Sequence, residues 1–190
     1  NLEKLGMGPD PKGMDRYSVL LSIIPRVASP FGQEVALPEN IGLPLEFLLK
    51  PLGLSWVPTP RFSSLREEGN YTTRYQPEQK AVVFDLKQAG RLAVEQLLLD
   101  WRWLMRNGYQ YAAIEVPVAQ PGLGSLYDLL SGHGFFVSGF IPYHFSDKLG
   151  FRFQALGPAK VAFDKIKIAT ENGRRLLEFI KQDCAANTLT

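Results

Sequence analysis

The chain has few of the residues that build metal sites and disulfide frameworks. Its 190 residues include one cysteine, Cys184, and two histidines, His133 and His144. A single cysteine cannot form a disulfide within the chain, and it cannot supply the several thiolates of a structural zinc site. Neither histidine stands near an acidic cluster at metal-ligating spacing. We therefore expect no metal site.

Long apolar runs and a strong charge imbalance are also missing. No stretch approaches the roughly 20 apolar residues that span a bilayer, and residues 1–16 lack the charged start and apolar block of a signal peptide. The formal net charge is only +2, and the basic residues are scattered along the chain. Without a basic stripe or a base-reading motif, nucleic-acid binding is not expected. These absences predict a soluble, cytoplasmic protein that binds neither membrane nor nucleic acid.

The composition is sufficient for one sizeable core, because 45% of the residues are hydrophobic and 21% are charged. We expect a lead-in rich in Gly and Pro over residues 1–32, a main domain over residues 33–158 and a helical extension over residues 159–190. The apolar residues 17–24 predict a strand within the lead-in. Because position 1 is not methionine, we interpret the lead-in as the tail of a preceding module in a longer protein.

The first part of the main domain predicts mixed elements. Residues 34–54 indicate a short strand, a turn, and a helix that begins at Pro44, where the missing N–H has no helical partner. Residues 55–70 indicate a loop, because Pro58 and Pro60 interrupt any strand there. Residues 71–76 and 81–87 then predict two strands joined by a tight turn.

The longest helix is expected over residues 91–108, where apolar side chains recur at helical spacing and Gly108 stands at the left-handed cap position. The buried stripe is Val94, Leu97, Leu98, Trp101, Leu104 and Met105. Residues 111–118 then predict an interior strand, apolar except for Glu115. Two strands linked by a helix form a crossover unit, so we expect them to be parallel neighbours.

The last third predicts a short helix, a hairpin and a final helix. Ser125 and Asp128 have the spacing of a capping box, and Gly132 and Gly134 end the helix that follows. The alternating residues 135–141 and 149–156 predict an antiparallel hairpin. The final amphipathic helix is expected over residues 171–183, with three apolar side chains facing inward: Leu176, Leu177 and Ile180.

This order of elements, with a Leu-rich helix running into Gly-Phe and a strand containing Gly139, resembles the GNAT family of acyl-CoA N-acyltransferases. The resemblance covers about residues 33–157 and implies an α/β fold with a central mixed sheet flanked by helices. The stretch from Gly134 to Leu156 is similar to GNAT-like modules that some bacterial proteins attach to ATP-binding domains of the anti-sigma-factor kinase type. No ATP-binding motif of that kind occurs in the 190 residues.

The resemblance implies acetyl-CoA as the cofactor, with its pyrophosphate held at the start of the long helix. The family's loop has the form [Q/R]-x-x-G-x-[G/A], and the matching residues here are KQAGRL, residues 87–92. Lys87, Gln88, Gly90 and Arg91 are the candidate cofactor-binding residues, because free N–H groups and a close backbone attract phosphate. Leu92 departs from the pattern. Arg91 fits a bound anion or an ordinary solvated surface equally well.

The resemblance also implies candidate catalytic residues. The family's proton donor, a tyrosine four residues before the glycine of Gly-Phe, would fall on Leu130, so Tyr127 is a candidate only as an offset acid. Glu115 and Asp85 are candidates for the base that deprotonates an amine. The alternative is that both carboxylates face a solvent-filled cleft or pair with Arg or Lys.

The sequence is compatible with three functions. The chain is a GNAT-like module that binds a small acyl-CoA-like ligand or docks a partner protein domain in a regulatory role. It is, alternatively, an active N-acetyltransferase that uses acetyl-CoA. The third reading is a scaffold that only forms a homo-oligomer. The departures at Leu92 and Leu130 favour the first reading.

Overall fold

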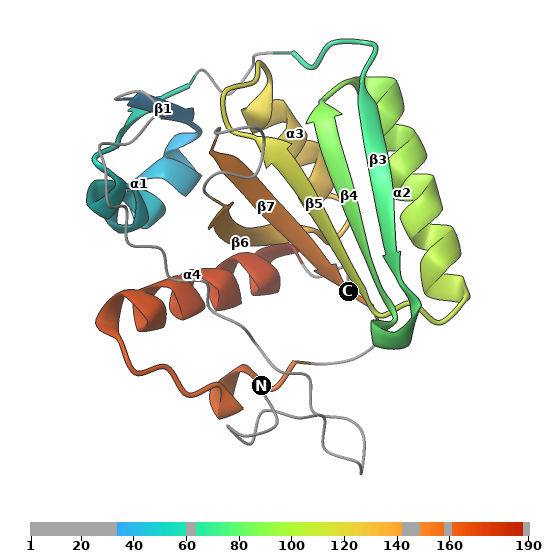
Figure 1. The fold of residues 1–190 in the computed structure, drawn as a ribbon. Coiled ribbons are helices and arrows are strands. Elements are labelled where there is room, and N and C mark those ends of the chain that lie inside the picture. Colours follow the sequence, from blue (N-terminus) through green and yellow to red (C-terminus); the bar gives the residue numbers. More distant parts are fainter. Residues whose placement is uncertain (1–33, 60–63, 142–148, 158–160, 188–190) are drawn as a thin grey trace.

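The computed structural model describes residues 34–59, 64–141, 149–157 and 161–187. The predicted lead-in with its strand at 17–24 lies outside these residues, as does His144. Among the described residues, a five-stranded mixed sheet forms the centre of the molecule (Figure 1). Its strands lie in the order β3 (Asn70–Gln76), β4 (Ala81–Gln88), β5 (Tyr111–Pro117), β7 (Gly150–Leu156) and β6 (Phe136–Ile141).

The central pair of strands confirms the predicted crossover. β4 and β5 are parallel neighbours and are linked by helix α2 (Arg91–Arg106), while β3 and β7 pair antiparallel to them on either side. The pairing between β4 and β5 runs from Ala81 and Tyr111 to Asp85 and Glu115. Both strands continue beyond this last pair without pairing to each other, so they diverge at their carboxyl ends.

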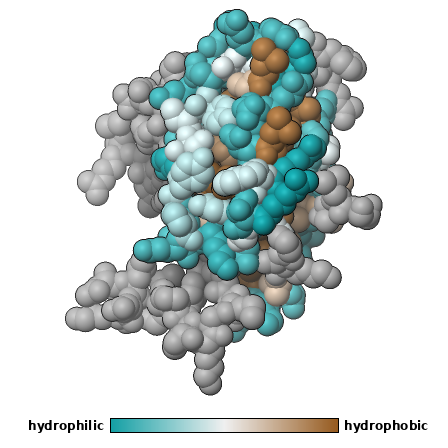
Figure 2. Space-filling model, turned by 90° about the vertical axis from the view of Figure 1, so that its right-hand side faces the viewer, coloured by the Kyte–Doolittle hydropathy of each residue, from teal (hydrophilic) through white to brown (hydrophobic). Residues whose placement is uncertain are grey.

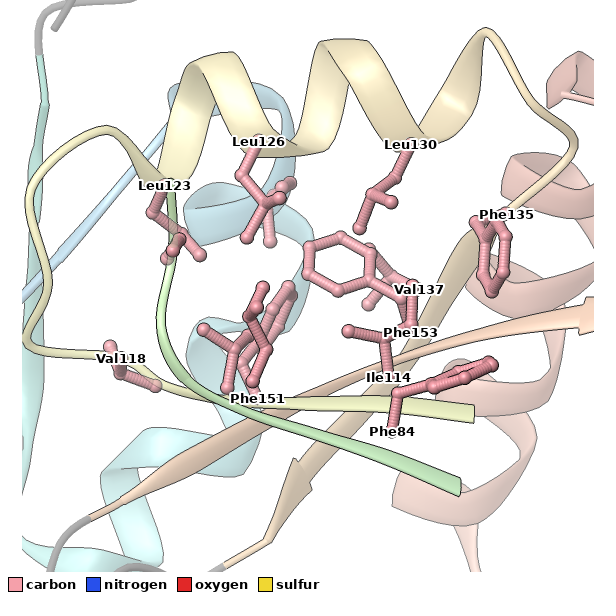
Figure 3. Close-up of a cluster of buried hydrophobic side chains, with 14 of the residues drawn as sticks. Phe84, Ile114, Val118, Leu123, Leu126, Leu130, Phe135, Val137, Phe151 and Phe153 are labelled. Carbon is pink, nitrogen blue, oxygen red and sulfur yellow. The ribbon is translucent and has the colours of Figure 1, made fainter. Parts of the chain in front are cut away.

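Helices α2 and α3 (Leu123–Ser131) cover one face of the sheet (Figure 1). The stripe predicted for α2 is buried or, at Met105, partly buried. Figure 3 shows Leu126 and Leu130 pointing from α3 toward Phe151 and Phe153 of β7. Because these side chains belong to one continuous apolar cluster, burial holds the helices and the sheet together.

The outer face of α2 is mostly hydrophilic. Figure 2 shows this side of the molecule, where hydrophilic residues surround a few apolar ones. Leu92, Leu99 and Trp103 are the exposed large apolar residues of α2. Trp101 stands two residues before Trp103, on nearly the opposite side of the helix, and is buried as predicted.

The structure corrects two predictions for the first part of the domain. Helix α1 (Glu39–Leu49) begins five residues before Pro44, and Pro44 lies inside the helix. The helix tolerates this proline because Ile41, Leu45 and Leu49 bury its apolar side. Residues predicted as loop form strand β2 (Ser55–Pro58), parallel to β1 (Glu34–Leu37).

Strand β2 tolerates Pro58 because the proline is the last residue of the strand and the sheet has only two strands. Losing one backbone hydrogen-bond donor there costs little stability. Short 3-10 turns follow α1 (Lys50–Leu52) and β3 (Pro77–Gln79), and another lies at Phe163–Lys165. The turn between β3 and β4 is the tight connection that the sequence predicted.

The predicted capping box is wrong. Helix α3 begins at Leu123, two residues before Ser125, and it has no side-chain cap. Its N-cap is Gly122, whose φ of 79° is a conformation that glycine adopts without strain. The predicted hairpin is confirmed, because β6 and β7 pair antiparallel with a register shift between Val137 and Gly139.

The final helix α4 (Glu171–Asn187) extends beyond its predicted end and packs against β6 and α1. Leu176 is buried as predicted. Asp183 is also buried, which the sequence did not predict. The Asp183 carboxylate accepts hydrogen bonds from the Val137 N–H (2.6 Å) and the Tyr127 hydroxyl (2.7 Å). These bonds fix α4 to the register shift of β6 and to α3.

The described residues therefore form a mixed α/β fold, with a five-stranded mixed sheet flanked by helices, as the GNAT resemblance implied. None of the helices in the described part of the chain is long and apolar enough to cross a bilayer.

Candidate functional site

The candidate site lies where β4 and β5 diverge. Asp85 and Glu115 form the last pair of the two strands and lie side by side. Beyond them, Lys87 and Gln88 are exposed at the end of β4, and Gly90 is the N-cap of α2. The structure thus brings the predicted base candidates and the predicted phosphate loop to the same end of the sheet.

The first amides of α2 are already hydrogen-bonded to the chain itself. The N–H groups of Arg91 and Leu92 donate to the carbonyl oxygens of Arg66 (2.8 Å) and Glu67 (3.1 Å). In a helix these N–H groups have no internal partner, and they are the groups that would bind a phosphate. The segment 64–69, here called the cover segment, supplies carbonyl oxygens in place of phosphate oxygens.

The cover segment approaches the phosphate loop so closely that only glycines fit. A Cβ at Gly90 would lie 2.1 Å from the carbonyl carbon and oxygen of Glu68, and one at Gly69 would lie 2.4 Å from the Gly90 nitrogen. The small residue of the loop, which the resemblance assigned to phosphate, is therefore needed here for contact with backbone. Pyrophosphate does not fit this cradle while the cover segment is in place.

Arg91 has intramolecular anionic partners at this position. Its guanidinium donates to the carboxylates of Glu67 (2.5 Å) and Glu95 (2.9 Å). These hydrogen bonds raise the pKa of Arg91, and the bond to Glu67 has the largest effect. Because all three side chains are exposed, the ion pairs contribute little to stability. They nevertheless place negative charge beside Arg91, whose positive charge is by itself unfavourable at the N-terminus of a helix.

Two further contacts lie at the point where β4 and β5 diverge, on the side of β5. The Gln120 side-chain oxygen accepts a hydrogen bond from the Ala89 N–H at 2.9 Å, which joins the segment after β5 to the phosphate loop. Leu65 of the cover segment packs against the apolar cluster. It also lies beside Gly122, where a Cβ would be 3.1 Å from its Cδ2 atom. The cover segment therefore contacts the start of both helices.

The base candidates belong to a network of four charged side chains on the sheet face opposite α2. Arg74 of β3 donates to both oxygens of Asp85 (2.9 and 3.2 Å) and to Glu115 Oε2 (2.7 Å). Arg152 of β7 donates to Glu115 Oε1. Strand register explains the contact, because Asp85, Glu115 and Arg152 are paired residues on three neighbouring strands.

Burial makes Glu115 the centre of this network. Its side chain is 1% exposed, whereas the two arginines that hold it are 49% and 36% exposed. A buried carboxylate without partners would be strongly destabilising, and two guanidiniums remove most of that cost. The pKa of Arg74 is raised, and the hydrogen bond to Asp85 is the largest cause. The alternative that both carboxylates pair with arginine is therefore observed, and a catalytic role remains a prediction.

Tyr127, the candidate acid, points its hydroxyl toward α4. The hydroxyl donates to Asp183 at 2.7 Å, and the ring lies 6.3 Å from that of Phe153. Burial and then the hydrogen bond to Asp183 raise the pKa of Tyr127 above its usual range. In this arrangement the hydroxyl stabilises the packing of α4, and its role as an acid stays a prediction.

Sequence reasoning missed several residues of the site. Arg74 and Arg152 stand on strands that are 78 positions apart in sequence, and they reach the same carboxylate only because of the strand order and register. Asp183 lies near the end of the predicted amphipathic helix, where no local pattern indicates that a carboxylate is buried. One signal was available for the cover segment: Gly69 precedes a strand directly, and glycine there often marks a close approach of two backbones.

Comparisons with known proteins give one distant structural likeness. No protein-family model and no curated protein matches the chain. The crystal structure of a nourseothricin acetyltransferase is similar to 46% of this chain, at 11% identity and a TM-score of 0.37. The chain spans 56% of the length of that structure. At this TM-score the likeness carries no argument about this chain.

Proposed function

We propose that this chain is a GNAT-like binding or regulatory module that does not transfer acyl groups. The observation that carries the proposal is the pair of hydrogen bonds from the Arg91 and Leu92 N–H groups to the cover segment. A ligand's pyrophosphate would have to replace both carbonyl oxygens, and it would also have to displace the exposed Arg91–Glu67 ion pair. Binding energy spent on this displacement lowers affinity for any CoA derivative.

The side chains with candidate catalytic roles support the same proposal. Both oxygens of Glu115 accept hydrogen bonds from arginine, so an amine substrate would compete with two guanidiniums for the base. The hydroxyl of Tyr127 is engaged with a buried carboxylate. An acid and a base held in this way are suited to maintaining structure rather than to moving protons.

The second candidate is an N-acetyltransferase that uses acetyl-CoA. The divergence of β4 and β5 beyond Asp85 and Glu115 favours it, because this is where the family resemblance expects the cofactor's arm. This function requires the cover segment to leave the phosphate loop before the cofactor binds.

Calorimetric titration of acetyl-CoA and of inorganic pyrophosphate into the protein tests the proposal. We expect no saturable heat at millimolar concentrations with the unaltered chain. The variant Gly69→Ala places a Cβ within 2.4 Å of the Gly90 nitrogen and forces the cover segment to shift. Pyrophosphate binding should therefore appear in this variant.

Gly132→Ala is the matched control, because a Cβ there meets its nearest atom at an ordinary 3.5 Å. It should behave like the unaltered chain. Saturable acetyl-CoA binding by the unaltered protein, followed by acetyl transfer to an amine, would refute the proposal in favour of the enzyme.

A further inference from the structure

A cavity lies on the sheet face opposite α2, between the strands and the C-terminal segment that leads into α4. Its volume is about 1060 Å³, and its lining includes β5, β6 and β7 on one side and residues 161–180 on the other. α4 lies beside β6 in Figure 1. The phosphate loop and the cover segment do not contribute to the lining.

The walls of this cavity are mainly apolar. Phe136 and Leu156 line it from the sheet, and Phe163, Leu177 and Ile180 line it from the C-terminal segment. A cavity of this size and lining is typical of sites that bury most of a small ligand. A ligand with an extended apolar portion would remove both these walls and its own surface from water.

The charged groups of the cavity are basic. Arg152 and Lys167 line it, and no aspartate or glutamate is among the described residues of the lining. Arg74, Asp85, Glu115 and Arg152 carry two positive and two negative charges, so their network is balanced. Lys167 also lines a neighbouring hollow with Asp164, Arg174, Glu178 and Lys181, and these three basic and two acidic residues leave one excess positive charge beside the cavity.

The Arg152 side chain is accessible from the same wall. It lines the cavity and is 36% exposed, although its Nε atom is buried and its Nη2 atom binds Glu115. A carboxylate of a ligand would pair with this guanidinium and with the positive charge of Lys167.

We infer that this cavity binds an amphipathic monoanion, a carboxylate attached to an apolar chain. The carboxylate lies between the Arg152 side chain and Lys167, and the apolar chain lies among the aromatic and aliphatic side chains of β6 and α4. This inference rests on the proposed function only in that both describe a ligand-binding module. The two are tested separately, because the acetyl-CoA titration bears on the phosphate loop and not on this cavity.

Titration with dodecanoate, a saturated twelve-carbon carboxylate, tests the inference. The dodecanoate concentration is kept below that at which this carboxylate forms micelles. We expect saturable binding by calorimetry. Dodecanol, which has the same chain without the charge, should bind about tenfold more weakly, because it leaves a charged donor without an anionic partner. Equal affinity for the two ligands, or no binding of dodecanoate, would overturn the inference.

Lys167→Glu is the informative variant, because Lys167 is exposed and stands outside the network that holds Glu115. It should weaken dodecanoate binding about fivefold or more and leave dodecanol unaffected. Lys165→Glu makes the same charge change at an exposed residue that does not line the cavity, and it should have a much smaller effect.

Equal effects of the two variants would mean that the anion responds only to net charge, which would overturn the inference. Light scattering across a concentration series addresses a competing occupant. A dimer whose formation abolishes dodecanoate binding would assign the cavity to a second copy of the chain, and this result too would overturn it.

Discussion

On the helix-covered face of the sheet, Phe84, Ile114 and Phe153 pack into a buried apolar cluster. On the opposite face, the residues next to them in sequence, Asp85, Glu115 and Arg152, form ion pairs across the same strands. Alternation along each strand sends neighbours to opposite faces, so the two faces share one backbone and one register.

This comparison separates stability from ligand chemistry within one sheet. The covered face contains the side chains whose burial drives folding. The opposite face keeps a buried carboxylate, unsatisfied donor capacity and a large cavity, none of which a stable core requires. A protein that only needed a scaffold could replace Glu115 and its partners by apolar residues of similar volume at little cost.

The largest effect is expected on the covered face. Phe153 is fully buried, and its ring lies 5.0 Å from that of Phe151. Phe153→Ala should lower the free energy of unfolding by about 3–5 kcal/mol, because it removes apolar burial and leaves a cavity. Urea denaturation measures this change, and a loss under about 1 kcal/mol would contradict the assignment of the core to this face.

A smaller loss is expected for the opposite face. Glu115→Gln keeps the shape of the side chain but removes the charge that binds Arg74 and Arg152. We expect a loss of about 2 kcal/mol in the free energy of unfolding, the value typical of hydrogen bonds to charged groups. Glu78→Gln, on the exposed turn between β3 and β4, is the control and should change stability little. An unchanged free energy of unfolding in Glu115→Gln would mean that the network is not formed in solution.

The junction of α3 and α4 should lose less again. Tyr127→Phe removes one of the donors to Asp183, while the Val137 N–H remains. The expected cost is about 1 kcal/mol in chemical denaturation. Because the pKa of Tyr127 is raised, its contribution is present below pH 10 and is lost as the pH rises, when the unfolded chain ionises first. In an absorbance titration, the folded unaltered protein and folded Tyr127→Phe should show the same number of tyrosines ionising near pH 10. After unfolding, the variant should show one fewer.

The smallest effect concerns His133, at the edge of the covered face. Burial and then the nearby Arg102 charge lower its pKa below 6.5. The folded state therefore favours the neutral ring, so stability is unaffected above pH 6.5 and decreases as the pH falls through the lowered pKa. His133→Gln should remove this dependence in thermal denaturation between pH 7 and pH 5. An unchanged slope would show that another group titrates there.

Much of the covered face could be predicted from the sequence, and little of the opposite one. The apolar stripe around Trp101 and the alternation around Phe151 and Phe153 indicate elements by their period alone. The meeting of Arg74, Glu115 and Arg152 depends on which strands are neighbours and in what register. That information lies in contacts between distant residues, and local patterns do not contain it.

The phosphate loop shows the same limit. The sequence located Gly90 and Arg91 correctly at the start of α2. It could not predict that residues 66 and 67 would hydrogen-bond to the helix there, because the antiparallel pairing of β3 with β4 is what brings the cover segment beside the loop. The errors at Pro44, Pro58 and Ser125 have a different origin, since packing and edge position outweighed local propensity.

The most direct test of the account is the response of the Arg91 and Leu92 amides in ¹H–¹⁵N correlation spectra. Both N–H groups donate to carbonyl oxygens of the cover segment, so they should be protected from hydrogen exchange. Their resonances should also be unmoved by acetyl-CoA at millimolar concentration. Rapid exchange of both amides in the free protein, together with a saturable shift on adding acetyl-CoA, would contradict the account.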